Sequence, residues 1–224
     1  GCFEQTTSIT YPNVMALAYL NANGMRNPDV IAKATHFVHL GYQRLLSFEV
    51  KGGGFSLYGR SPASLPLTAY GLMEFNDMAR VHNVDPALLD RTAKWLAEKQ
   101  RPDGSWPSRS RWQQRRGVGD LATSAYITWG LAEYDPALPA VREGAKFVAR
   151  NFEAAGDSHT LALCANALFA AGRYATGVET LSKLARMAES PTRGQNLWRA
   201  RGASLSYSRG SGSDVETTSL VVLA

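Results

Sequence analysis

Apolar residues recur along most of the chain at the spacing of an α-helix, and glycine, proline or asparagine separates one run from the next. The first run, Val14 to Leu20, is too long and too rich in alanine and leucine for a strand, and an Asn-Gly pair ends it. This pattern predicts a short helix over residues 12–22. Asn27 and Pro28 then supply a cap and a first helical position for a second helix.

The same alternation continues to the end of the chain. Strand signals are nearly absent throughout the sequence. Further helices are predicted at residues 65–81, 86–100, 121–134, 139–152, 159–171 and 175–188. Four segments form a weak internal repeat and are apolar almost all round, at residues 67–75, 122–132, 159–168 and 216–224. Their partner helices carry charged stripes instead.

A helix that is apolar on every face is expected to be buried on every face, and one with a charged stripe faces water. The repeat therefore predicts inner and outer layers of helices, that is, an all-α fold built as an α/α toroid of concentric helical hairpins. The inner layer would hold Val14–Leu20 and the predicted helices that begin at Leu65, Leu121 and His159. A plain helical bundle is the alternative.

A loop between two of these helices supports the toroid. Gln100, Asp103, Gly104 and Trp106 match the Gln-x-x-Asp-Gly-x-Trp pattern that triterpene cyclases repeat between toroid helices. In those proteins the Gln and Asp tie helix ends together and the Trp stacks beneath. Since a structural tie requires no substrate, the motif indicates a fold and not a chemistry.

Composition narrows the class of protein. The 224 residues are 45% apolar and 19% charged, and no apolar run approaches the roughly 18 residues of a membrane span. A net charge of +5 is too small and too scattered to indicate nucleic acid as a partner. The chain begins on a motif at Gly1 and stops within the apolar run 219–224, so we expect one domain, 1–224, cut from a larger multidomain protein.

Candidate chemistry lies at the start of the chain, in Gly1-Cys2-Phe3-Glu4-Gln5. Cysteine and glutamine three residues apart lie on one side of a helical turn, so the sulfur can reach the side-chain carbonyl and displace ammonia. The product is a thioester, which is a far stronger electrophile than the amide. An ordinary thiol at a loop-to-helix junction is the alternative for Cys2. Glu4 could orient the ring or cap the helix, or it could be a solvated acid.

Water must be kept away from such a bond, and the nearby apolar and aromatic candidates for cover are Phe3, Tyr11 and Pro12. The second cysteine, Cys164, lies within an apolar predicted inner helix, where a buried and inert thiol is expected.

The motif resembles the Gly-Cys-x-Glu-Gln internal thioester motif of the alpha-2-macroglobulin and complement family, and the stretch that follows it is most similar to bacterial members. Segments 67–70 and 93–104 are similar to the family's inner-helix and loop segments, in the same order and at similar separation. The resemblance implies an internal thioester between Cys2 and Gln5 that captures a target by acyl transfer. The capture would be a single-turnover trap without cofactor or metal, in an extracytoplasmic protein.

The resemblance also implies a choice of nucleophile. Complement members that prefer hydroxyl targets have a histidine on the loop after the Pro-Asp-Gly segment, and residues 105–117 contain none. Direct attack by amines of proteases or other targets is therefore expected. The four histidines are His36, His39, His82 and His159. Without a third ligand beside His36 and His39, a metal site is not expected. We expect the charges of four arginines to keep that loop exposed to water; they are Arg109, Arg111, Arg115 and Arg116.

Two other function classes remain at this stage. A toroid enzyme, either a terpene cyclase or a prenyltransferase-like protein, would need an Asp-rich cluster or a zinc ligand set, and the sequence lacks both patterns. A non-catalytic binding module with a vestigial motif is the other. Incorporation of methylamine would separate the thioester interpretation from both. The expected partners are other domains of the parent protein and amine-bearing targets, with no nucleic acid and no membrane insertion.

Overall fold

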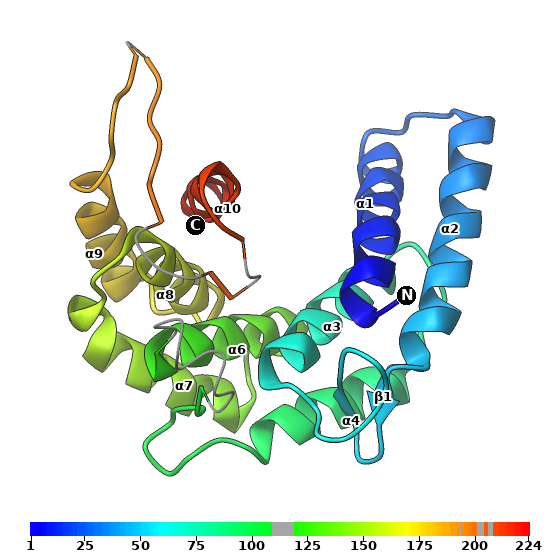
Figure 1. Cartoon of the computed structure of the whole chain (residues 1–224), viewed down its shortest axis with the longest axis horizontal. Helices are drawn as coiled ribbons and strands as arrows, with labels where there is room; N and C mark the ends of the chain where they lie inside the picture. Colours follow the sequence, from blue (N-terminus) through cyan, green and yellow to red (C-terminus); the bar gives the residue numbers. More distant parts are fainter. Residues whose placement is uncertain (109–118, 193, 201–203, 206–207) are drawn as a thin grey trace. The chain divides into compact units, whose positions relative to one another are not determined.

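The computed structural model describes residues 1–108, 119–192, 194–200, 204–205 and 208–224, and nearly all regular structure in them is helical (Figure 1). The helices are α1 (Phe3–Ala22), α2 (Pro28–Leu46), α3 (Leu65–Met78), α4 (Pro86–Ala97), α6 (Asp120–Tyr134), α7 (Pro139–Asn151), α8 (Ser158–Ala170), α9 (Tyr174–Ala185) and α10 (Ser211–Leu223). A single 3₁₀ turn, Phe152–Ala154, follows α7. Strands β1 (Glu49–Val50) and β2 (Gly54–Phe55) form one short antiparallel hairpin. The all-α prediction is confirmed, and the toroid stays a prediction.

Contacts between Cα atoms divide the chain into two compact units, Gly1–Glu98 and Lys99–Ala224. Each unit has its own core, and the expectation of a single domain stays a prediction. Within the described residues, no helix combines the length and the apolar character that crossing a membrane requires.

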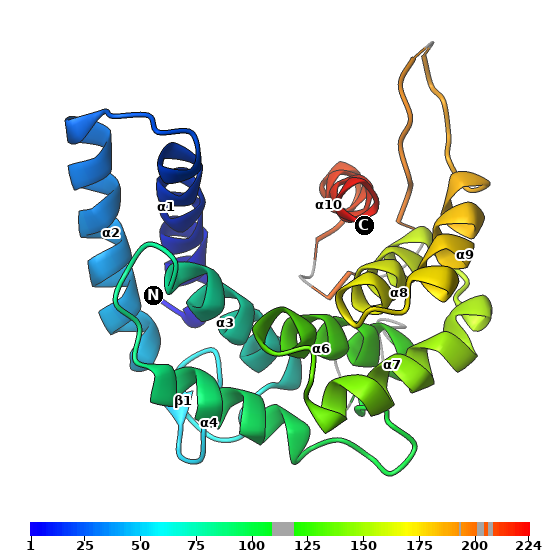
Figure 2. The same cartoon turned by 180° about the vertical axis from the view of Figure 1, so that it is seen from behind.

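The first unit is built on the hairpin of α1 and α2, which lie side by side in both views (Figures 1 and 2). Helix α1 also packs on α3, and α3 packs on α4 and β2. An aromatic cluster fills the space between these elements. The ring centroids of Phe3 and Phe55 are 5.6 Å apart, and those of Phe55 and Phe75 are 5.5 Å apart.

Helix α1 begins at Phe3, nine residues before the predicted start at residue 12. The sequence pattern did not predict this segment as helix, because it contains threonines and a proline. In the structure the hydroxyl of Thr6 donates to the Cys2 carbonyl and that of Thr10 to the Thr6 carbonyl, so both side chains bond one turn back along the helix. Pro12 lies within the helix and is exposed.

The helices predicted for the inner layer, together with the apolar segment at the end of the chain, differ in how fully they are buried. Helices α6 and α8 are buried along most of their length, because α7 covers α6 and α9 and α10 cover α8. Cys164 on α8 has no exposed surface, and burial raises the pKa of its thiol. The expectation of burial on every face is wrong for α1, which exposes Met15 and Tyr19, and for α10. Helix α10 has α8 as its main described packing partner and exposes Val215, Val222 and Leu223.

In the loop before α6, Gln100 ties the loop to α7 as the motif predicts, whereas the Asp103 side chain bonds within the loop itself. The Gln100 amide donates to the Gly104 carbonyl at 3.0 Å and to the Ala140 carbonyl on α7 at 2.9 Å. Asp103 accepts two hydrogen bonds from Ser105, and Trp106 is fully buried. The bond from Gln100 to Ala140 holds the loop on the first turn of α7.

Candidate functional site

Cys2 and Gln5 lie together on the first turn of α1. Cys2 is the N-cap, with extended backbone, and Gln5 is the third helical residue. The backbone N–H of Cys2 donates to Gln5 Oε1 at 3.1 Å, which is one arm of a capping box. Cys2 is half-buried and Gln5 is exposed. The turn therefore holds the glutamine carbonyl back against the cysteine, with the glutamine side open to an incoming group.

Two contacts fix the position of this turn. The Phe3 N–H donates to the Leu57 carbonyl at 2.9 Å, and the Phe3 ring is fully buried in the aromatic cluster. On the other side, a guanidinium nitrogen of Arg44 on α2 donates to the Gly1 carbonyl at 3.2 Å. The Arg44 guanidinium also lies 4.9 Å from the centroid of the Phe48 ring. The residues on either side of Cys2 are thus bonded to different parts of the chain, Gly1 to α2 and Phe3 to the loop after β2.

The three residues predicted to cover the site hold other positions. Phe3 supports the turn from the core, and the Tyr11 hydroxyl donates to an Asp77 carboxylate oxygen on α3 at 2.6 Å. Pro12 is exposed. These positions assign Phe3 and Tyr11 to holding α1 on its neighbours.

A buried carboxyl lies between α1 and α3. Glu74 on α3 has no exposed surface, and its Oε2 accepts a hydrogen bond from the Thr7 hydroxyl at 2.9 Å. Burial raises the pKa of Glu74 to about 8, although the Thr7 hydrogen bond opposes the shift. Among the described residues no group hydrogen-bonds to its Oε1. Burial also raises the pKa of Tyr70, and the charges of Glu74 and Glu4 add to that increase.

Glu4 follows the same trend. It is half-buried on the first turn, and desolvation raises its pKa. The orienting role for Glu4 stays a prediction.

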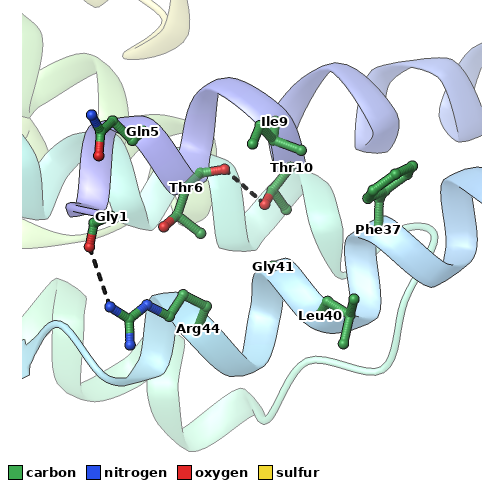
Figure 3. Close-up of a pocket in the computed structure, with 9 residues that line it drawn as sticks. All are labelled: Gly1, Gln5, Thr6, Ile9, Thr10, Phe37, Leu40, Gly41 and Arg44. Carbon is green, nitrogen blue, oxygen red and sulfur yellow. Dashed lines mark hydrogen bonds between the residues drawn. The ribbon is translucent and has the colours of Figure 1, made fainter.

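An open groove of about 500 Å³ runs between α1 and α2 and reaches Gln5 (Figure 3). Its size is within the range of small-ligand pockets. The lining residues are Gly1, Gln5, Thr6, Ile9, Thr10, Phe37, Leu40, Gly41 and Arg44. The groove is therefore continuous with the turn that carries Cys2.

No histidine is among the residues that line this groove. His36, His39 and His82 belong to the same unit, but none of them lines it, and the His39 and His82 rings are 5.8 Å apart. His159 is buried in the second unit, where its Nδ1 lies 3.3 Å from the Thr217 hydroxyl. In the described residues no group of three or more histidine, cysteine and acidic side chains is placed to hold a metal ion. The predicted arginine-rich loop, with Arg109, Arg111, Arg115 and Arg116, lies outside the described residues.

Sequence reasoning missed three residues near the site. Leu40 and Arg44 line the groove, and Glu74 is buried close to the same helix. Two signals were available: Leu40 is an apolar residue outside the buried stripe of its helix, and Glu74 is the one acid in an otherwise apolar run. The position of Arg44 against Gly1 had no signal, because 43 residues separate the two.

Comparison with known proteins shows which family the chain resembles. The sequence model of the A-macroglobulin TED domain matches residues 1–224. Similar relatives include two alleles of thioester-containing protein 1 from Anopheles gambiae. Allele R1 is 26% identical over 196 residues, which are 84% of this chain and 15% of the relative. Allele S3 is 25% identical over 234 residues, which cover 100% of this chain and 17% of the relative.

The chain thus spans about a sixth of the length of the curated relatives that it matches. Those relatives are insect proteins, so the narrower likeness to bacterial members stays a prediction. The match does not favour a toroid enzyme. Because the family model covers every residue of the chain and the first turn of α1 joins Cys2 to Gln5, the chain belongs to the A-macroglobulin TED domain family.

Proposed function

We propose that the chain is an internal thioester domain that captures amine-bearing targets covalently, within a larger alpha-2-macroglobulin-like defence protein. The observation that carries this proposal is the hydrogen bond from the Cys2 N–H to Gln5 Oε1 across one helical turn. It places a nucleophilic side chain and an acyl group on the same turn, which is the arrangement that intramolecular acyl transfer needs.

The bond forms from the chain's own residues. The Cys2 sulfur, as thiolate, attacks the side-chain carbonyl carbon of Gln5, and the carbon–nitrogen bond of the amide breaks. The leaving nitrogen takes up the proton that the Cys2 thiol lost and departs as ammonia, and the glutamine acyl group becomes a thioester of Cys2. The Cys2 N–H that holds Oε1 is positioned to stabilise the negative charge that develops on this oxygen.

Capture reverses the roles of the two residues. A neutral amine of the target attacks the Gln5 carbonyl carbon, the carbon–sulfur bond breaks, and Cys2 leaves as thiolate. The amine loses a proton, and an amide joins the target to Gln5. Because nothing in this chemistry restores the thioester, each molecule acts once, as a covalent trap and not as a turnover catalyst.

The setting of this chemistry is also part of the proposal. Thioester-containing proteins that match the chain are about six times its length, which supports other domains of one parent protein as its immediate partners. The proposed targets are proteases or other proteins with accessible amines. We place the parent outside the cytoplasm, in a secreted, periplasmic or membrane-anchored form.

Labelling with methylamine tests the proposal in the full-length protein. We expect one thiol to be released for each methylamine bound, and Cys2→Ala and Gln5→Ala each to abolish both events. Cys164→Ala is the matched control, because Cys164 has no exposed surface and should leave labelling unchanged. Labelling that persists in Cys2→Ala would contradict the thioester.

The same assay separates direct attack from a histidine relay. Glycerol should react far more slowly than methylamine, and single replacement of His36, His39, His82 or His159 by alanine should leave methylamine transfer intact. A folded histidine variant that no longer incorporates methylamine would overturn direct attack.

A further inference from the structure

We propose that the groove between α1 and α2 binds the acyl acceptor, and that it prefers primary amines with an apolar body and a neutral or anionic far end over amines with a second positive charge. This inference rests on the proposed function, since it assigns the substrate class of the same site. It commits to a lysine-like amine of a target as the occupant.

The position of the groove comes first. Gly1 and Gln5 form one end of its lining, and Figure 3 shows both beside the first turn of α1. A group that occupies the groove therefore lies next to the carbonyl that the proposed reaction transfers. If an amine is held there, its attack on the carbonyl becomes a step within a complex instead of a bimolecular collision. This change accelerates acyl transfer strongly.

The walls of the groove are apolar. Ile9 on α1 is 57% exposed and Leu40 on α2 is 48% exposed, with the half-buried Phe37 beside them. The hydroxyls of Thr6 and Thr10 already donate to the backbone carbonyls of Cys2 and Thr6, as the dashed line for Thr10 shows in Figure 3. The surface is thus suited to the methylene chain of a lysine side chain, which gains by covering apolar area.

The charge of the groove is set by one residue. Arg44 is the sole charged side chain among the nine that line it, and no acid opposes it there. The Gly1 carbonyl and the Phe48 ring hold its guanidinium in place. From the Gly1 end of the groove, this positive charge acts along the length of a bound amine at low salt, where it repels a second ammonium group and attracts a carboxylate. It also favours the neutral form of a nearby amine, which is the form that attacks.

Four amines test the two properties separately in the full-length protein. Methylamine is the small reference, hexylamine adds an apolar body, aminohexanoate adds a carboxylate at the far end, and cadaverine adds a second ammonium. The readout is the rate constant for thiol release by each amine divided by that for methylamine, with cadaverine halved for its two amines. We expect aminohexanoate to exceed cadaverine by about tenfold at low salt.

Matched variants assign that preference to the groove. Arg44→Glu should reverse the order of aminohexanoate and cadaverine, and Arg44→Gln, which keeps a donor for Gly1, should bring their ratio close to one. Leu40→Gln should lower the ratio of hexylamine to methylamine by about fivefold. Val30→Gln is the control, because Val30 is an exposed apolar residue of α2 that does not line the groove.

The outcomes distinguish the two levels of the proposal. If no amine releases a thiol from the wild-type protein, the proposed function fails. If thiol release occurs but the ratios are the same in the wild type and in all folded variants, the thioester stands and acceptor binding in the groove is overturned. That second result would leave the groove to another occupant, such as a neighbouring domain or a second copy of the chain.

Discussion

Glu74 is an acid in a place where charge is costly. Its side chain is fully buried on α3, and its one hydrogen bond given by the described residues comes from Thr7 on α1. Moving a carboxylate out of water is expensive unless donors surround it, so the group retains its proton instead. The neutral acid can then sit between two helices without a cation beside it.

This residue predicts a dependence of stability on pH. The pKa of Glu74 is raised from its ordinary value of 4.5 to about 8 in the folded chain. Between these values the folded chain holds a proton that the unfolded chain releases. The contribution to stability is therefore fully present below about pH 4.5 and is lost as the pH rises to about 8, at up to about 1.4 kcal/mol per pH unit. Urea denaturation at a series of pH values would measure it.

Glu74→Gln is the variant that isolates this effect. Glutamine keeps the shape of the side chain and an acceptor for Thr7, but it cannot ionise. We expect the decline between pH 4.5 and 8 to flatten, with the variant more stable than the wild type above pH 8. An unchanged decline in the variant would assign the pH dependence to other groups.

Residues differ in how far sequence alone can place them. Cys2 and Gln5 could be placed together because their spacing is local and one helical turn sets the geometry. Glu74 and Arg44 could not, because their surroundings come from helices that the chain reaches only after many residues. Local periodicity does not predict which side chains will contact an element that is distant in the sequence.

At the scale of elements, the α1–α2 hairpin is the frame of the site, and Gly41 sets its spacing. A Cβ atom at Gly41 would overlap the side chain of Thr10 on the facing helix, so only glycine permits the helices to approach this closely. Both residues also line the groove. The width of the groove is thus linked to one backbone contact.

We expect Gly41→Ala to lower the free energy of unfolding by about 1–3 kcal/mol, because overpacking outweighs the higher helix propensity of alanine. Denaturation in urea would measure the change. Gly156→Ala is the control, since an added Cβ there meets no atom within 4 Å. Gly41→Ala combined with Thr10→Ala should recover part of the loss, and a Gly41→Ala protein as stable as the wild type would show that the hairpin tolerates separation.

Helix boundaries were predictable where neighbouring residues in the sequence supply all the capping signals. Asn27 caps α2 through its side chain, with the Val30 N–H as donor, and Pro28 follows at the first position, as the sequence indicates. Residues 6–12 of α1 were not predictable as helix, because threonine and proline usually mark an interruption and here lie within one helix. The hydroxyls of Thr6 and Thr10 are satisfied inside the helix, a detail that composition does not reveal.

At the scale of the whole molecule, the two compact units unfold either together or one at a time. Each unit has a local anchor: Gly41 in the α1–α2 hairpin, and Gln100, whose amide bonds the carbonyls of Gly104 and Ala140. These anchors are far apart in sequence and lie in different units. A variant at each one can therefore test the expectation of a single domain.

Gln100→Ala leaves the carbonyls of two buried residues, Gly104 and Ala140, without that amide, and we expect it to lower the free energy of unfolding by about 1–3 kcal/mol. Gln43→Ala is its control, since Gln43 is exposed and its one described side-chain bond is to His39. In a single domain, Gln100→Ala should increase hydrogen exchange under near-native urea in peptides from both units, because one cooperative transition exposes them all. Gly41→Ala, which lies in the first unit, should likewise increase hydrogen exchange in peptides from both units. Faster exchange confined to the unit that carries the change would show that the chain contains two folding units, each stabilised by its own core.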